Sequence, residues 1–428
     1  MLENEEGRTH TKDERKAWKE ERRELERALE VLQQPLKEAG IPVVLVFEGW
    51  SAAGKGEVIA RTIARLDPRN YQVLTFGPAT DEEKRRPLLW PFWKGLPAKG
   101  QIAVLERSWF GRALERMEEE PKETSQLVEE LNIFERQLCD DGYLVLKFFL
   151  HIGQAEQHRR LEKLAGDDDT AWRVTDRDWR QNRDYVRRKE KLDLLLQATS
   201  TPHAPWHVVW NEEKGSGPLE VLRTVKAALD DALAHGVPRP APAERAPWPL
   251  LEMPRLGQVD LSPRVAENDY DAALKKEKKR LAKLHSRLYR EKVPVVIGFE
   301  GWDAAGKGGA IRRLSWARDP RGFDVVPIAA PTKDELDRHY LWRFWRQLPK
   351  DGHIVLFDRT WYGRVMVERL ENLTPEARWS MGYDEINEFE RSLTRWGAVV
   401  LKFWLHIDPD EQLRRFRDRE NTPEKRYK

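Results

Sequence analysis

The chain has 428 residues, enough for two domains with cores of their own, and 35% of them are charged, although the net charge is only +2. That balance gives no electrostatic reason to expect a nucleic-acid partner. The single cysteine excludes a disulfide framework, and neither a signal peptide nor an apolar run of the roughly 20 residues that span a bilayer is apparent. We therefore expect a cytoplasmic protein without a membrane partner.

The first half of the chain alternates between helical and strand-like segments. A charged amphipathic stretch at residues 12–38 predicts a helix, and apolar runs predict strands at 43–47, 71–76, 102–106, 143–152 and 206–210. Amphipathic helical stretches lie between these runs. Such alternation predicts an α/β fold with a parallel sheet flanked by helices on both faces, and ligands then bind at the carboxyl ends of the strands.

A proline-dense segment follows, GVPRPAPAERAPWPLLEMPRLG at residues 236–257, and its composition predicts an extended linker. Beyond it, the second half repeats the first. Residues 43–112 and 295–364 are identical at 32 of 70 positions, and the match resumes at 132–152 and 387–407. A second amphipathic stretch, 267–291, precedes the second copy. We expect a first domain at 12–236, a linker at 237–262 and a second domain at 263–428.

The two copies differ in length after their last shared strand. The first continues through a charged helical region to the apolar run at 206–210, whereas the second stops at Lys428, about where the first has reached Arg173. The second domain is therefore expected to be truncated at its C-terminus and to lack its final helices and strand.

Each copy carries one glycine-rich loop, GWSAAGKG at 49–56 and GWDAAGKG at 301–308. The pattern G-x-x-x-x-G-K follows an apolar strand and precedes a helical stretch, Gly308 to Arg318, which is the context of a phosphate-binding loop (Walker A). Gly301, Gly306 and Gly308 let backbone N–H groups approach phosphate oxygens, and Lys307 would neutralise a transferring phosphoryl group. Glycine stands where such loops usually have a magnesium-binding Ser or Thr, so Asp303 is the candidate metal ligand.

A second acid follows the strand in HIVLFDRTWYGR, residues 353–364. In phosphate-loop proteins the acid after a second buried strand reaches magnesium, and an adjacent arginine can grip phosphate oxygens. We predict that Lys307, Arg343, Arg359 and Arg364 form a cationic track beside Asp303 and Asp358. The alternative is that Asp358 caps the next helix and that the arginines pair with surface acids.

The first copy departs from this set at three positions: Ser51 replaces Asp303, Glu106 replaces Asp358 and Pro91 replaces Arg343. The counterparts that remain are Lys55, Arg107 and Arg112. Because magnesium tolerates little misplacement of its ligands, we expect this copy to hold phosphate weakly, to transfer little and to act mainly as a scaffold.

Two basic helical stretches, 156–164 and 411–420, follow the last shared strand of each copy. Such arms can close over a substrate and exclude water, with Arg414 and Arg415 as the candidate residues. A solvated helix face is the alternative.

Together, FEGWDAAGKGG, LWRFWRQLP, FDRTWYGR and LKFWLHIDPDEQLRRF resemble the polyphosphate kinase 2 family, and the tandem arrangement resembles its two-domain class, the polyphosphate:AMP phosphotransferases. The resemblance implies two tandem domains with a thymidylate-kinase-like phosphate-loop fold, inorganic polyphosphate as donor, Mg²⁺, and AMP converted to ADP. It implies that Asp303 and Asp358 serve magnesium, that Lys307 and Arg359 act in catalysis, and that Arg343 and Arg364 bind phosphates. It also implies a homo-oligomer or an internal pseudo-dimer.

Two other functions fit the same residues. One is a phosphate-loop kinase that uses ATP on a small metabolite, which the missing Ser or Thr after Lys307 and the density of arginines disfavour. The other is a non-catalytic protein that binds polyphosphate or a regulatory partner, which Ser51 and the short second copy favour.

Overall fold

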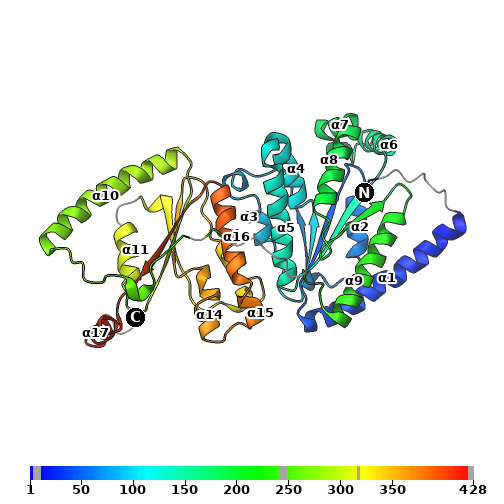
Figure 1. Ribbon diagram of the computed structural model, residues 1–428. Helices are drawn as coiled ribbons and strands as arrows, with labels where there is room; N and C mark the ends of the chain where they lie inside the picture. Colours follow the sequence, from blue (N-terminus) through cyan, green and yellow to red (C-terminus); the bar gives the residue numbers. More distant parts are fainter. Residues whose placement is uncertain (3–10, 241–247, 250, 316–318, 423–428) are drawn as a thin grey trace. The chain divides into compact units, whose positions relative to one another are not determined.

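The computed structural model describes residues 1–2, 11–240, 248–249, 251–315 and 319–422 (Figure 1). These residues form two compact units. The first unit comprises Met1–Thr80, Pro91–Ala243 and Asp337–His339, and the second comprises Asp81–Trp90, Glu244–Leu336 and Tyr340–Lys428. Each unit is thus built mainly from one repeat, and a short segment of the other repeat belongs to it, which the sequence did not predict.

The sheet of the first repeat has the strand order β2-β3-β1-β4-β5, and all neighbouring strands are parallel. The five predicted strands are confirmed as β1 Val43–Gly49, β2 Tyr71–Thr75, β3 Ile102–Glu106, β4 Leu144–His151 and β5 Trp206–Trp210. All eight residues of β4 are buried, as expected for a strand near the middle of a parallel sheet that is covered on both faces.

Helices cover both faces of this sheet. Figure 1 shows α4 and α5 on one face and α2, α9 and α1 on the other, and α9 packs against α1 and α2. The helices of the first repeat are α1 Lys12–Ala39, α2 Lys55–Thr62, α3 Trp90–Lys94, α4 Trp109–Glu119, α5 Thr124–Asp140, α6 Gln154–Ala165, α7 Asp176–Arg183, α8 Tyr185–Ala198 and α9 Ser216–His235. The predicted α/β fold with a parallel sheet is confirmed.

The second repeat builds an equivalent sheet in the order β7-β8-β6-β9, again parallel, within the residues that the structure describes. Its strands are β6 Val295–Gly301, β7 Phe323–Pro327, β8 Ile354–Asp358 and β9 Val399–Leu405. Its helices are α10 Glu267–Arg290, α11 Lys307–Ser315, α12 Lys333–Leu336, α13 Trp342–Trp345, α14 Val367–Leu370, α15 Glu376–Trp379, α16 Gly382–Arg395 and α17 Pro409–Glu420. None of the described helices of either repeat is long and apolar enough to cross a bilayer.

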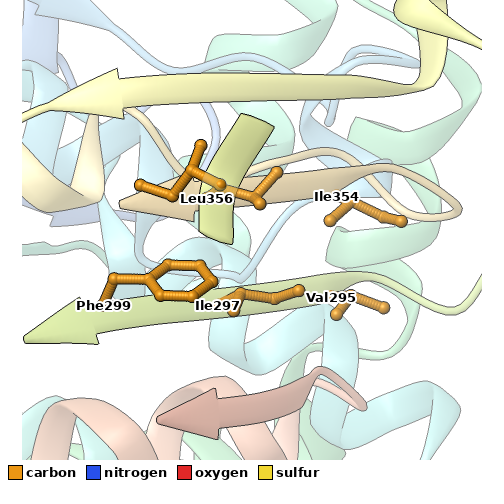
Figure 2. Packing of buried hydrophobic residues seen from close by; sticks show 6 residues of the cluster. Val295, Ile297, Phe299, Ile354 and Leu356 are labelled. Atoms are coloured by element: carbon orange, nitrogen blue, oxygen red, sulfur yellow. The ribbon is translucent and has the colours of Figure 1, made fainter. Parts of the chain in front are cut away.

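The core of the second unit lies between β6, β8 and α11. Alternate side chains of β6 (Val295, Ile297 and Phe299) face the same way as Ile354 and Leu356 of β8 (Figure 2). Alternation places these residues on one face of each strand, and Ile311 of α11 covers them. This packing fixes the start of α11, and hence the glycine-rich loop, against the carboxyl end of β6.

The amphipathic stretches at 12–38 and 267–291 are helices, as predicted, and correspond to α1 and α10. The helix after the second loop, expected to reach Arg318, is described as far as Ser315, and residues 316–318 lie outside the described residues. In the proline-dense segment the structure describes only part of the chain, including a single 3₁₀ turn at Leu256–Gln258.

Candidate functional site

The glycine-rich loop connects β6 to α11 in the second repeat and β1 to α2 in the first. Gly301 has φ 140°, and a Cβ there would collide with the carbonyl oxygen of Leu405, so only glycine fits. Lys307 Nζ donates to the carbonyl oxygens of Gly301 at 2.7 Å and Trp302 at 3.1 Å. Lys55 makes the same two bonds at 3.1 and 3.0 Å. Both loops therefore hold their lysine at the N-terminus of a helix, where anions are favoured.

Asp303 and Arg359 are brought together beside the second loop, as predicted. Nη2 of Arg359 lies 3.5 Å from Oδ1 of Asp303, and the two side chains are 56% and 67% exposed. Arg359 has φ 69°, a left-handed conformation that costs free energy in a residue with a Cβ. Its N–H donates to the carbonyl of Phe299 at 3.0 Å, which ties this turn to β6. The same conformation recurs at Arg107, with φ 61°.

Asp358 ends β8, the strand next to β6, and pairs in register with Phe299. It does not cap the following turn, because the hydroxyl of Thr360 accepts the N–H of Tyr362 at 3.3 Å. No group of three or more His, Cys, Asp or Glu side chains suited to a metal occurs among the described residues. Two carboxylates still fit Mg²⁺, since this ion commonly binds through one or two carboxylates together with substrate phosphates and water.

The other two arginines of the predicted track are engaged by neighbouring acids. Arg343 lies 3.2 Å from Glu335 and donates to the carbonyl of Ala329 at 3.0 Å. Arg364 lies 2.9 Å from Glu368, and its guanidinium stacks over the ring of Tyr340 at 4.2 Å. Neither forms an ion pair with Asp303 or Asp358 in the described structure. Each would have to leave its acid to bind a phosphate.

Sequence reasoning missed a carboxylate that ends the loop-bearing strand in both repeats, Glu48 and Glu300. Glu300 accepts the N–H and the hydroxyl of Thr360, each at 2.7 Å, and so holds the residue after Arg359. Glu48 accepts the hydroxyl of Ser108 at 2.7 Å. Burial raises the pKa of both carboxyls. The hydrogen bonds that they accept and the charge of the nearby loop lysine lower it, but the effect of burial is larger. The sequence could have indicated these carboxylates, because a glutamate follows the apolar run at the same position in both repeats.

The first loop also has a carboxylate that the sequence did not reveal. Asp178 of α7 accepts the hydroxyl of Ser51 at 2.6 Å, and Gln181 accepts the N–H of Ser51 at 2.8 Å. Although burial disfavours its charge, hydrogen bonds from Ser51 and Thr175 and the charge of Arg107 lower the pKa of Asp178. Thr175 and Asp178 also form a capping box, so the local pattern indicated only a helix start. The first loop therefore has a negative charge beside it, although Ser51 stands where the second loop has Asp303.

The basic arms do contact the loops. Gln412 and Arg415 of α17 donate to the carbonyl oxygens of Asp303 and Ala304 at 2.9 and 3.0 Å. Gln157 and Arg160 of α6 make the equivalent bonds to the first loop at 3.2 and 3.3 Å. Arg414 instead pairs with Glu411 and Asp418. Of the two candidate arginines, Arg415 therefore braces the loop, whereas Arg414 forms exposed ion pairs.

Because Asp178 places a negative charge beside Ser51, replacing Ser51 with the aspartate of the second loop is expected to be unfavourable. Ser51→Asp is expected to lower the free energy of unfolding by roughly 1–2 kcal/mol, because two carboxylates would then face each other. Equilibrium urea unfolding measures this loss. The double variant Ser51→Asp/Asp178→Asn should recover most of it, and failure to recover would show that the contact is unimportant.

A buried histidine supports the first loop and should make its stability pH-dependent. Trp50 Nε1 donates to Nδ1 of His151 at 2.9 Å, and burial lowers the pKa of His151 from 6.5 to about 4. Between these values the unfolded chain binds a proton that the folded chain does not, so stability falls as the pH drops through this window. The loss should reach about 3 kcal/mol, from about 1.4 kcal/mol per pKa unit.

Urea unfolding at pH 7 and at pH 4 tests this expectation. His151→Phe should lose less stability between the two pH values than the unaltered chain. An unaltered pH dependence in His151→Phe would contradict the assignment.

The chain is similar to known proteins along most of its length. The profile of the family described as polyphosphate kinase 2 matches residues 12–235 and 264–428. The chain is 39% identical over 417 residues to a polyphosphate:AMP phosphotransferase of Pseudomonas syringae pv. tomato, covering 94% of this chain and 84% of that protein. It is 40% identical over 412 residues to one of Pseudomonas aeruginosa, covering 95% and 83%. A crystal structure of a polyphosphate kinase 2 from Pseudomonas aeruginosa PA01 superposes with a TM-score of 0.83 at 37% identity, covering 99% of this chain and 85% of that one.

Proposed function

Because this chain belongs to the polyphosphate kinase 2 family, we propose that it transfers the terminal phosphoryl group of inorganic polyphosphate to AMP and so forms ADP. The similar proteins of both Pseudomonas species are named polyphosphate:AMP phosphotransferases, and the similarity extends over both repeats. The observation that carries the proposal is the loop of the second repeat, which presents Lys307, Asp303 and Arg359 together at the carboxyl end of a parallel sheet.

In the proposed reaction a phosphate oxygen of AMP attacks the terminal phosphorus of polyphosphate in line with the leaving oxygen. The P–O bond to AMP forms as the P–O bond within polyphosphate breaks, and the shortened chain leaves with the electron pair. Such transfer needs positioning and charge neutralisation more than covalent catalysis. Lys307 and the N–H groups of the loop would hold the phosphoryl group, and Arg359 would neutralise its oxygens.

Asp303 and Asp358 would hold Mg²⁺ together with phosphate oxygens, and the ion, when bound, neutralises charge that develops on the phosphates. Arg343 and Arg364 would bind the polyphosphate chain after leaving Glu335 and Glu368. Gln412 and Arg415 would keep the loop in place by holding the carbonyls of Asp303 and Ala304.

We assign turnover to the second repeat and a weaker phosphate site to the first. Domains at 12–236 and 263–428, joined by a linker at 237–262, are part of this proposal, as is a cytoplasmic location. In the first repeat, Lys55, Arg107 and Arg112 are the cations that would bind an anion, but Asp178 and Gln181 already accept hydrogen bonds from the hydroxyl and the N–H of Ser51. A phosphate would compete with both.

The test is ADP formation by the purified chain from AMP and Mg²⁺ with either polyphosphate or ATP as donor. ADP formed with polyphosphate alone supports the proposal, and turnover with ATP only would identify an ATP-dependent kinase. Polyphosphate binding without transfer would identify a non-catalytic binding protein. Removal of Mg²⁺ with a chelator should abolish transfer, and added Mg²⁺ should restore it.

A further inference from the structure

The ion pair of Arg359 with Asp303 holds the arginine side chain only weakly. The two charged groups are 3.5 Å apart, and their side chains are 56% and 67% exposed. Water screens a pair of this kind, so it contributes little to fixing either side chain. The position of the Arg359 guanidinium therefore depends on the backbone turn that carries it.

The backbone of that turn is itself strained. Arg359 has a left-handed φ of 69°, and such a conformation persists in a residue with a Cβ only where the surroundings hold it. The N–H of Arg359 donates to the carbonyl oxygen of Phe299 at 3.0 Å, which fixes one side of the turn. The next residue, Thr360, is buried. Its contacts decide whether the turn keeps its shape.

Glu300 supplies these contacts. Its Oε1 accepts both the backbone N–H and the hydroxyl of Thr360, each at 2.7 Å. Because two donors of one residue converge on a single oxygen, any rotation of Thr360 away from β6 would break both bonds. Phe299 and Glu300, which are neighbours on β6, thus hold two successive residues of the turn, Arg359 and Thr360.

Close packing supports the same contact. A Cβ at Gly298 would lie 2.8 Å from the methyl carbon of Thr360, so the strand leaves room for this methyl group only because it has a glycine there. The first repeat has Val46 and Ser108 at the two positions. Where the strand has the larger side chain, the turn has the smaller one. Strand and turn therefore fit each other in both repeats, as close-packed interiors require.

The first repeat builds the same turn beside its own loop. Arg107 has φ 61°, and its N–H donates to the carbonyl oxygen of Phe47 at 3.1 Å. Glu48 accepts the hydroxyl of Ser108 at 2.7 Å and the N–H of Gly111 at 3.3 Å. The chain thus contains one buried glutamate contact twice, once beside the loop to which we assign turnover and once beside the weaker site.

We propose that Glu300 is a positioning residue for phosphoryl transfer: by holding both donors of Thr360, it keeps Arg359 in its left-handed conformation and directs the guanidinium towards the phosphoryl group. This inference rests on the transfer reaction proposed above for the second repeat. The effect of Glu300 passes through Arg359, and displacing a positioned group by about 1 Å can cost roughly 10²-fold in rate. Loss of Glu300 should therefore matter only while Arg359 is present.

Kinetics of the full chain test this role. Glu300→Ala should lower kcat for ADP formation by about ten- to a hundredfold and change KM less, because Arg359 would act on charge that develops during transfer. Glu300→Gln keeps an oxygen for Thr360 and should lose less. Glu48→Ala removes the same contact from the first repeat and should change kcat by less than about twofold. Circular dichroism spectra check that each variant is folded.

A double-variant cycle separates positioning from a direct role. Glu300→Ala combined with Arg359→Ala should be no slower than Arg359→Ala alone, because residues that act as one unit are not additive. Losses that multiply in the double variant would overturn the inference. An unchanged kcat in Glu300→Ala would overturn it too, as would an equal loss of kcat in Glu48→Ala, which would indicate a merely structural contact.

Binding provides a readout that needs no turnover. Calorimetry with tripolyphosphate and Mg²⁺ uses chains that carry Lys55→Ala, so that the second loop dominates the signal. Glu300→Ala should weaken the affinity by at least about threefold when Arg359 is present and should leave it unchanged in the Arg359→Ala background. Equal weakening in both backgrounds would overturn the inference. An unaltered chain that forms no ADP would instead contradict the proposed function, and the binding cycle would still decide the role of Glu300.

Discussion

Lys307→Ala is expected to lower the rate of ADP formation from polyphosphate and AMP by about 10²–10³-fold, the loss typical when one preorganised donor to a developing charge is removed. The ammonium group lies at the start of α11, where the carbonyl oxygens of Gly301 and Trp302 hold it. Initial rates at saturating polyphosphate and Mg²⁺ measure the loss. Since the lysine would act on the transferring group, kcat should fall more than KM changes.

Lys55→Ala is the matched control, because Lys55 makes the same two loop bonds in the first repeat. It should cost less than about tenfold in rate, as expected of a residue outside the reacting site. If Lys55→Ala and Lys307→Ala reduced the rate equally, turnover would not belong to the second repeat alone. If Lys55→Ala alone were inactive, the assignment would be reversed.

Lys147→Met is expected to destabilise the protein by about 3–5 kcal/mol, because it leaves a buried carboxylate without its partner. Nζ of Lys147 lies 2.6 Å from Oε2 of Glu135, and both side chains are 0% exposed. Burial lowers the pKa of Lys147 and raises that of Glu135, so neither group is easily kept charged without the other. Equilibrium urea unfolding, followed by tryptophan fluorescence, measures the loss.

The second repeat supplies the control for this variant. Lys402 and Glu390 form the same pair at 2.7 Å, but their side chains are 49% and 14% exposed, so Lys402→Met should cost less than about 1 kcal/mol. The double variant Lys147→Met/Glu135→Leu removes both charges and should recover much of the stability, which also shows that the single variant is not simply misfolded. Equal losses at Lys147 and Lys402 would contradict the role of burial.

Much of the fold was predictable from the sequence, because the apolar runs are short, rich in Val, Leu and Ile, and bounded by turns. The five strands of the first repeat appear where the runs predicted them, and the loops lie between a strand and a helix. The candidate site was predictable only in part. Asp303 and Arg359 meet, but Arg343 and Arg364 are paired with acids whose position depends on short helices that the pattern did not indicate.

By itself, the sequence determined the duplication, the family and the residues that differ between the copies, because these are properties of order along the chain. Only the tertiary structure decided that Asp178 faces Ser51 across 127 positions and that Glu300 holds Thr360. Contacts between residues far apart in the chain depend on how helices pack against sheets, and local patterns of polarity do not encode that packing.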